Sequence, residues 1–235
     1  MSDAAPRATL ATELTNGLAA LGLELSSAQQ EQLLDYLGLL ARWSRVYNLT
    51  AVREPMAMLT HHLLDCLAVV GPLRNQLDRL WPRWEAGDAP PLRALDVGSG
   101  AGLPGVVLAI CCPTLRVDCV DTVGKKAAFV QQVAGHLKLS HLRGVHARAE
   151  SLGPQYQVIA SRAFAALPDL VRWTRGALEQ GGVWVAMKGQ RPQQEIDALP
   201  QAVEVFHVEP LRVPGLHAAR CLVWMRKAEP TQPAD

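Results

Sequence analysis

The stretch Asp96-Val97-Gly98-Ser99-Gly100-Ala101-Gly102 decides the fold, because it closes the largely apolar run 92–97 with an acid and then three glycines at alternate positions. Glycine allows the backbone to turn at positive φ, and it lets a ligand approach where a Cβ would otherwise stand. A helix that follows such a loop points its free N–H groups at the ligand. The stretch therefore predicts a nucleotide-cofactor loop between a strand and a helix.

Two classes of nucleotide site compete for this loop. Residues 100–105 fit the dinucleotide pattern G-x-G-x-x-G, and Asp121 follows about 20 residues later, where such sites place an acid. Asp96, however, lies two positions before the first glycine and would repel a pyrophosphate. It suits a cationic ligand, and D-x-G-x-G-x-G resembles the first motif of class I S-adenosylmethionine (SAM) methyltransferases. A capping Asp followed by glycines that only assist packing is the structural alternative.

Apolar runs alternate with helical patterns beyond the loop. Residues 115–120 predict a buried strand that ends at Asp121, whose carboxylate can accept bonds from both ribose hydroxyls of a cofactor. A helix is expected from Thr122 or Gly124, with its apolar face on the sheet. The short runs 144–147, 158–160 and 183–187 predict further strands. Strands that alternate with helices indicate an α/β fold with a parallel sheet.

Composition limits the classes of protein. With 235 residues, 49% of them apolar, the chain can bury a full core, and its net charge of +1 restricts any nucleic-acid surface to a local patch. The longest apolar run, 106–112, is too short to span a membrane, and no signal segment is evident, so we expect a cytoplasmic protein without a membrane partner. The five cysteines form no C-x-x-C and the seven histidines show no ligand spacing. We therefore expect no metal site.

The first part of the chain has helical patterns. Ser27-x-x-Gln30 fits a capping box ahead of a helix that runs to about Tyr47. Pro55 suits the first turn of a second helix over about 56–70, and a proline- and glycine-rich linker follows over 81–91. We therefore expect a helical cap and linker over 1–91, a cofactor-binding domain over 92–227 and a disordered tail over 228–235.

Further motifs connect the chain to one family. They are Trp43-x-x-Val46-Tyr47-Asn48-Leu49-Thr50-Ala51-Val52-Arg53, His62-x-x-Asp65, the glycine loop, Ser161-Arg162-Ala163-Phe164 and Lys188-Gly189. On these motifs, over roughly 18–226, the chain resembles the RsmG (GidB) family of bacterial 16S rRNA methyltransferases. The resemblance implies N7 methylation of guanosine 527 in the small subunit, with SAM as cofactor and S-adenosyl-L-homocysteine as product. It also implies a class I methyltransferase fold, a Rossmann-like and mostly parallel seven-stranded sheet with an N-terminal helical cap.

The resemblance and the loop together define candidate site residues. The resemblance places cofactor contacts on Gly98, Leu103, Ala149, Glu150 and Arg162. The loop argument adds Asp96, Gly100, Gly102 and Asp121. No catalytic residue is assigned, and the candidates are Arg162, Phe164 and Lys188. Candidate RNA contacts are the basic residues Arg53, Lys125, Lys126, Lys188 and Arg191.

The residues at the expected strand ends narrow the methyl acceptor. Methylation of an exocyclic amine usually uses an Asn/Asp-Pro-Pro-aromatic loop, but the chain has Ser161-Arg162-Ala163-Phe164 there. Methylation of pyrimidine C5 needs a nucleophilic cysteine, and none lies near the fourth or fifth strand end. Guanine N7 has a free lone pair, so its attack on the sulfonium methyl needs orientation and no general base. The guanosine must be unpaired or splayed out, and Phe164 can stack on it.

Two other classes of function stay open on the sequence. One is an NAD(P)-dependent oxidoreductase, which the G-x-G-x-x-G match favours. The other is a non-catalytic ribosome-binding factor that keeps SAM only as a ligand. For the methyltransferase, the expected substrate is 16S rRNA in the small subunit or its assembly intermediate, and the expected oligomeric state is a monomer.

Overall fold

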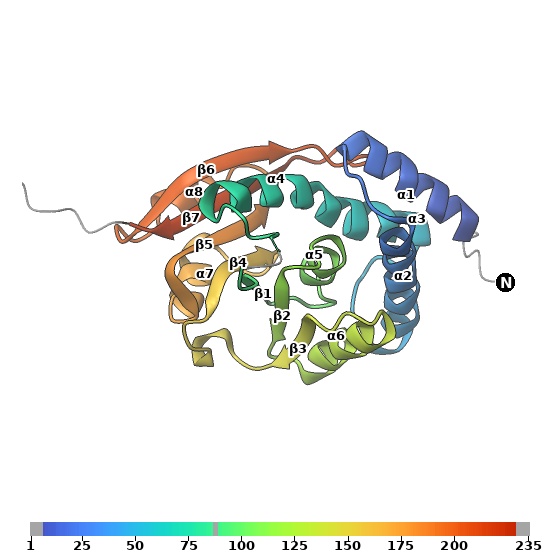
Figure 1. The fold of residues 1–235 in the computed structure, drawn as a ribbon, viewed down its shortest axis with the longest axis horizontal. Helices are drawn as coiled ribbons and strands as arrows, with labels where there is room; N and C mark the ends of the chain where they lie inside the picture. Colours follow the sequence, from blue (N-terminus) through green and yellow to red (C-terminus); the bar gives the residue numbers. More distant parts are fainter. Residues whose placement is uncertain (1–6, 87–88, 229–235) are drawn as a thin grey trace, which may run out of the picture.

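A computed structural model describes residues 7–86 and 89–228. They form one central sheet with helices on both faces (Figure 1). The tail expected to be disordered lies, from residue 229 on, outside the described residues.

The sheet has seven strands in the order β3-β2-β1-β4-β5-β7-β6. They are β1 (Arg93–Val97), β2 (Arg116–Asp121), β3 (Leu142–His146), β4 (Tyr156–Arg162), β5 (Leu178–Lys188), β6 (Val203–Leu211) and β7 (Arg220–Lys227). Neighbours among β1 to β5 pair in parallel, and β7 is antiparallel to both β5 and β6. This confirms the predicted mostly parallel, seven-stranded sheet.

Several strands are longer than their apolar runs. β4 extends over Tyr156–Arg162 and β5 over Leu178–Lys188, whereas the apolar runs indicate only their buried middles. β3 begins at Leu142 and ends at His146, because its register with β2 runs from Val117 to Asp121. Pairing with a neighbouring strand therefore carries each strand past its apolar run into polar residues.

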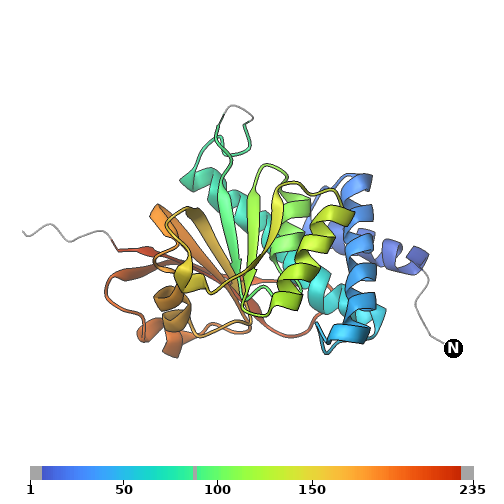
Figure 2. The ribbon, with the colours of Figure 1, turned by 90° about the horizontal axis from the view of Figure 1, so that it is seen from below.

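Helices cover the sheet unequally, as Figure 2 shows. On one face lie α4 (Asp65–Leu80), α5 (Gly105–Cys111) and α6 (Gly124–His136), and outside them α1 (Arg7–Leu21) and α2 (Ser27–Tyr47) form a second layer. The other face carries the shorter α7 (Leu167–Thr174) and α8 (Gln193–Asp197), with a 3₁₀ turn, η2 (Ala149–Ser151).

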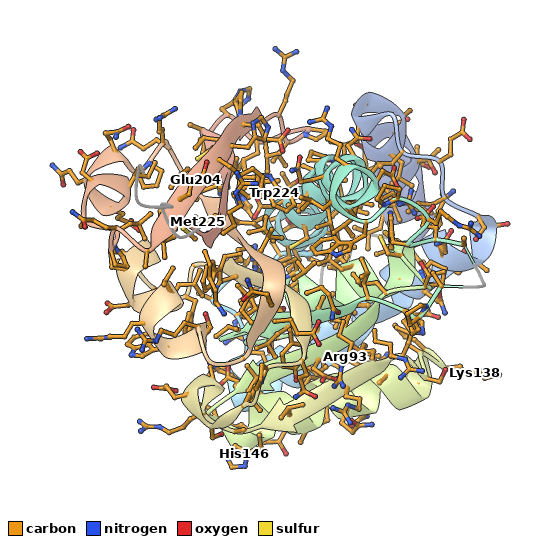
Figure 3. The ribbon with its side chains drawn as sticks, turned by 60° about the vertical axis from the view of Figure 1, so that its left-hand side comes forward. Arg93, Lys138, His146, Glu204, Trp224 and Met225 are labelled. Atoms are coloured by element: carbon orange, nitrogen blue, oxygen red, sulfur yellow. The ribbon has the colours of Figure 1, made fainter. Side chains whose placement is uncertain are left out.

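The two ends of the parallel strands lie on opposite sides of the molecule. His146 ends β3 and is paired with Asp121 at the end of β2, whereas Arg93 begins β1 and is paired with Arg116 at the start of β2; Figure 3 labels both His146 and Arg93. Ligands of open α/β sheets bind at the carboxyl ends. The His146 side is therefore the place to look for the cofactor site.

The capping box of α2 begins one residue earlier than predicted. Ser26, in extended conformation, accepts a hydrogen bond from the Gln29 N–H, and Gln29 Oε1 accepts one from the Ser26 N–H at 3.0 Å. The sequence Ser26-Ser27-Ala28-Gln29-Gln30 allows both registers, so the pattern alone does not distinguish them. The predicted end at Tyr47 is correct, and Asn48 follows in the left-handed region with a φ of 50°.

The second helix of the cap is longer than predicted. A four-residue helix, α3 (Pro55–Met58), a π-helical turn, η1 (Leu59–Leu64), and α4 form one continuous helix over Pro55–Leu80. Pro72 does not end it, because its apolar stripe continues through the buried Leu73 and Leu77. By length and composition this helix could cross a membrane, but 67% of its most apolar stretch is buried in the protein. Such burial is typical of a core helix.

The cap and the sheet share one apolar cluster. It contains Leu37 and Leu40 of α2 and Leu67 of α4 together with Ala94 and Val117 of the sheet. The buried Tyr36 also donates a hydrogen bond from its hydroxyl to the Ala101 carbonyl in the glycine loop, at 2.8 Å. The cap therefore packs directly against the backbone of the predicted cofactor loop.

We expect Tyr36→Phe to lower the free energy of unfolding by about 1–2 kcal/mol, because the buried Ala101 carbonyl loses its donor while the ring stays in place. Urea unfolding measures this change. Tyr47→Phe, at the exposed end of α2, is the control and should change stability by less than about 0.5 kcal/mol. Equal stabilities of the two variants would contradict a structural role for this bond.

Candidate cofactor site at the carboxyl edge of the sheet

The glycine loop lies at the point where the strand order of the sheet reverses. It joins β1 to α5, and β1 pairs with β2 on one side and with β4 on the other. Gly98, Gly100 and Gly102 have φ angles of +64°, +57° and +85°. L-residues with a Cβ rarely adopt such angles, so the three alternate glycines meet a backbone requirement.

Phe164 packs onto the loop at Gly98. A Cβ placed on Gly98 would lie 1.9 Å from Phe164 Cδ2. Ala163 precedes it with a φ of 51°, which turns the chain sharply after β4. The ring of Phe164 therefore lies directly over the loop backbone, and glycine is required there for space as well as for φ.

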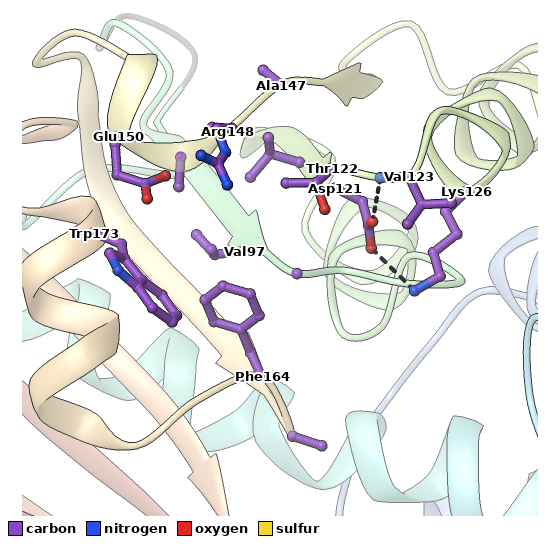
Figure 4. A pocket seen from close by; sticks show the side chains of 14 residues that line it. Val97, Asp121, Thr122, Val123, Lys126, Ala147, Arg148, Glu150, Phe164 and Trp173 are labelled. Atoms are coloured by element: carbon purple, nitrogen blue, oxygen red, sulfur yellow. Dashed lines mark hydrogen bonds and ion pairs between the residues drawn. The ribbon is translucent and has the colours of Figure 1, made fainter.

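A cavity of about 400 Å³ opens beside the loop (Figure 4). This volume lies within the range of small-molecule sites. The residues that line it are Val97, Gly98, Val120, Asp121, Thr122, Val123, Lys126, Ala147, Arg148, Ala149, Glu150, Ala163, Phe164 and Trp173. Four predicted cofactor residues, Gly98, Asp121, Ala149 and Glu150, are thus brought together at one cavity.

Backbone donors fix the carboxylate of Asp121. Its Oδ2 accepts a hydrogen bond from the Gly100 N–H at 3.1 Å, and its Oδ1 accepts one from the Val123 N–H at 2.8 Å. Each carboxylate oxygen can accept a further bond. Lys126, predicted as an RNA contact, lies 3.6 Å from Asp121 Oδ2 and lines the cavity. Asp121 is therefore oriented toward the cavity with acceptor capacity remaining.

Asp96 is buried beneath the loop. Its Oδ2 accepts a hydrogen bond from the Gly105 N–H at 2.8 Å, with Cys119 Sγ at 3.9 Å, and its Oδ1 has no partner among the described residues. Burial raises the pKa of Asp96 to about 7, although the Gly105 N–H and the charge of Arg162 oppose the shift. Asp96, predicted as a cofactor residue, lines neither cavity at this edge, because its side chain is buried below the loop.

A second, smaller cavity of about 140 Å³ lies between the loop and the cap. Gly98 borders both cavities, whereas the predicted Gly100, Leu103 and Arg162 border only the smaller one. The cap contributes His62, whose Nε2 lies 2.7 Å from Thr50 Oγ1. Burial and the charge of Arg162 lower the pKa of His62 to about 4, so the ring is neutral at physiological pH.

Arg162 joins the cap to the ends of β4 and β7. Its Nη1 donates to Asp65 Oδ2 and to the His61 carbonyl, both at 3.0 Å, and Arg220 Nε donates to Asp65 Oδ1 at 2.8 Å. The Asp65 side chain is only 4% exposed. The site residues inferred from the sequence omit Asp65, although the motif His62-x-x-Asp65 contains it.

The other predicted residues lie apart from both cavities or have protein partners. Gly102 borders neither cavity, and a Cβ there would meet Val106 Cγ2 at 2.5 Å, so it serves packing between α5 and its neighbours. Lys188 pairs with Glu195 at 2.7 Å. The remaining basic candidates are at the surface: Arg53 bonded to Asn48, Arg191 bonded to Gln193, and the exposed Lys125.

Sequence reasoning also missed parts of the cavity wall. Trp173 of α7 packs edge-on against Phe164, with ring centroids 5.6 Å apart. Arg148 lines the same cavity from the segment between β3 and η2. Neither residue belongs to a motif, so the sequence held no signal for them. Over 7–86 and 89–228, no group of three His, Cys, Asp or Glu residues is arranged to hold a metal ion.

These features define the class of protein. A sheet of order β3-β2-β1-β4-β5-β7-β6 with an antiparallel β7, a glycine loop after β1 and an acid at the end of β2 is the fold of class I SAM-dependent methyltransferases. Among solved structures, a mutant of MtNAS aligns over 95% of this chain and 76% of its own, with a TM-score of 0.53 and 13% identity. That similarity supports the fold alone.

Sequence relatives identify the family. The model of the GidB family, rRNA small subunit methyltransferase G, matches residues 29–223. A ribosomal RNA small subunit methyltransferase G of Paracidovorax citrulli is 59% identical over 218 residues, 92% of this chain and 90% of the relative. One of Albidiferax ferrireducens is 60% identical over 215 residues, 92% and 96% of the two chains. The chain belongs to the rRNA small subunit methyltransferase G family, which sets aside the NAD(P)-dependent oxidoreductase.

We expect Gly98→Ala to weaken SAM binding by about tenfold or more, because the new Cβ must displace Phe164 from the cavity wall. Calorimetric titration measures the affinity. The control is Gly22→Ala, which has a similar φ of +63° but no atom within 4 Å of the added Cβ. It should lose stability through backbone strain and keep its affinity for SAM. Equal affinities in the two variants would refute the close contact at Gly98.

The pKa of Asp96 predicts a pH dependence of stability. Because burial raises this pKa from 3.8 to about 7, the folded protein holds a proton that the unfolded chain releases. This contribution to stability is present at low pH and is lost as the pH rises from about 4 to about 7. Asp96→Asn should lack this pH-dependent contribution, because an asparagine side chain does not titrate.

Urea unfolding of both proteins at several pH values tests the sign. We expect the unfolding free energy of the native protein to fall relative to that of Asp96→Asn over this pH range. Parallel curves would contradict the raised pKa.

Proposed function

We propose that the protein transfers a methyl group from SAM to N7 of guanosine 527 of 16S rRNA, acting as a cytoplasmic monomer on the small subunit or its assembly intermediate. The observation that carries the proposal is the pair of cavities that share Gly98 above a buried carboxylate. SAM is cationic at its sulfonium and ammonium groups, and a cation above the loop would favour ionisation of the buried Asp96, whose Oδ1 has no partner among the described residues. NAD would instead place a pyrophosphate over that charge.

The larger cavity suits the nucleoside part of the cofactor. Asp121, held by two backbone N–H groups, faces it with free acceptor capacity for ribose hydroxyls. Ala149 and Glu150 also line this cavity, and we propose that they bond to the adenine edge through backbone and side chain. The smaller cavity beside Arg162 suits the amino-acid part, since Gly98 is common to both.

The site offers orientation rather than a base for the methyl acceptor. The cofactor supplies an electrophilic methyl group on sulfur, and guanine N7 supplies its own lone pair, so no proton needs removal before attack. The buried His62 is neutral, with a pKa of about 4, and is tied to Thr50. Phe164, backed by Trp173, gives a flat apolar wall on which a splayed guanine can stack.

The rim of the site carries the proposed RNA contacts. Arg53 and Lys125 are exposed on the cap and on the first turn of α6, and Arg191 is exposed just beyond β5. Lys188 is mostly buried by its pair with Glu195, so we propose that it positions the segment after β5. Exposed guanidinium and ammonium groups bind phosphates of any sequence. The chosen guanosine is therefore selected by the shape of the subunit around it.

We expect Asp121→Ala to weaken SAM binding by about 1.5–3 kcal/mol, the usual scale for hydrogen bonds to a charged acceptor. Calorimetric titration of a folded variant measures it. Asp169→Ala, which removes a surface acid paired with Arg172, is the matched control and should bind SAM normally. Unchanged SAM affinity of Asp121→Ala would remove the ribose assignment.

The position and chemical identity of the methylated nucleotide in 16S rRNA test the whole proposal. Small subunits from cells lacking the enzyme are incubated with the protein and labelled SAM, then treated with borohydride and aniline, which cleave RNA at N7-methylguanosine. Primer extension should stop beside guanosine 527 only after incubation, with one methyl per subunit, and Arg162→Ala should restore the stop poorly. Absence of label would favour the non-catalytic binding factor, and a methylated amine, adenosine or cytidine would reject the mechanism.

A further inference from the structure

Part of the sheet is not covered by a helix. On the face away from α5 and α6, the connection from β3 to β4 holds only the three-residue turn η2, while α7 and α8 pack farther along the sheet. Parallel strands are normally covered on both faces. Here Arg143 in β3 and Arg116 in β2 are instead exposed.

The open face carries a cluster of arginines at its amino edge. In the sheet register Arg93 is paired with Arg116, and Asp118 with Arg143, so all four side chains lie on the same face as Leu95. Together with Ser140 and His141 they line a cavity of about 310 Å³. We call these six residues the amino-edge cluster.

Asp118 holds two of the arginines in place. Arg143 donates to its two oxygens from Nε at 2.8 Å and from Nη2 at 2.9 Å, and Arg93 donates from Nη2 at 3.2 Å. The Tyr156 hydroxyl donates to Oδ2 at 2.8 Å, and the Arg93 guanidinium lies 5.3 Å from the Tyr156 ring centroid. Burial would raise the pKa of Asp118, but the bonds from Arg143, Tyr156 and Arg93 outweigh it and lower the pKa.

The charge of the cluster is not balanced within the described part of the chain. Three guanidinium groups face one carboxylate, and among the described residues Arg116 has no ion-pair partner. The lining has no aliphatic side chain to receive an apolar ligand. Guanidinium groups fixed in this way suit phosphate oxygens, which they can bind in a bidentate manner.

The cluster lies away from the cofactor site. It is at the amino ends of β1 and β2, whereas Asp121 ends β2, and the five steps of about 3.3 Å from Arg116 to Asp121 separate these two residues by roughly 17 Å. None of its residues lines either cavity at the carboxyl edge. The proposed methyl transfer therefore does not involve the residues of the amino-edge cluster.

We propose that the amino-edge cluster binds the phosphate backbone of the RNA substrate, as a second contact remote from the methylated base. This inference rests on the proposed function for the identity of the RNA. Phosphate contacts fix the position of a protein on nucleic acid without reading its sequence. The cluster thus adds affinity and orientation rather than base selection.

The test compares Arg116→Ala and Arg116→Glu with Arg79→Ala, an exposed arginine on α4, which packs over the opposite face of the sheet. Two fluorescein-labelled RNA hairpins of equal length are titrated at several salt concentrations, one with the sequence around guanosine 527 and one unrelated. We expect Arg116→Ala to weaken binding of both hairpins about three- to tenfold and to reduce the log–log salt slope by about 0.7–0.9. Arg116→Glu should weaken binding further, and SAM affinity should stay unchanged.

RNA affinities and salt slopes equal to those of Arg79→Ala would overturn the proposal. A second arm titrates inorganic phosphate and AMP and follows thermal unfolding. If Arg116→Ala loses stabilisation by these small anions while RNA binding is unaffected, the cluster is a small-anion site and the proposal fails. Because both arms measure binding, loss of RNA affinity in the Arg116 variants supports the inference even where no N7-methylguanosine forms.

Discussion

The glycine loop after β1 is confined on every side, and the rest of the site depends on that confinement. A Cβ at Gly98 would collide with Phe164, one at Gly105 would lie 2.3 Å from Cys119 Sγ, and the Ala101 carbonyl is held by Tyr36 from the cap. The loop backbone therefore packs directly against Phe164 and Cys119, and a side chain at Gly98 or Gly105 would displace it. The buried carboxylate of Asp96 lies below this backbone and gives it a preference for positive charge.

The same confinement makes the cap part of the candidate cofactor site. Tyr36 reaches the loop from α2, while Asp65 of α4 binds Arg162 and Arg220 at the ends of β4 and β7. A buried carboxylate shared by two arginines is costly to break, because one charge would be left unpaired. Movement of the cap would therefore disturb the wall of the smaller cavity, which His62 and Arg162 line together. Cap, loop and strand ends therefore form one packed unit around the smaller cavity.

Several elements of the fold and the candidate site could be predicted from residues that lie close together in the sequence. The glycine loop, Asp121 and the end of α2 follow from residues that are neighbours in the chain, and the structure confirms these elements. The Asp65 pairs join residues 97 and 155 positions apart, so no spacing rule identifies them. The predicted start of α2 is one residue late, because Ser26 and Ser27 both fit the capping box. The second helix is longer than predicted, because its buried residues continue the helix past Pro72. The Asp65 ion pairs and the length of the second helix depend on tertiary packing, which local sequence patterns do not encode.

The central claim is that a buried carboxylate matches this site to a cationic cofactor. The most direct test is calorimetric titration of SAM near pH 6.5 in two buffers that differ in ionisation enthalpy, for the native protein and for Asp96→Asn. A cation above the loop should lower the raised pKa of Asp96, so binding should release a proton to the buffer in the native protein and not in the variant. Heats of SAM binding to the native protein that are identical in both buffers would contradict the claim.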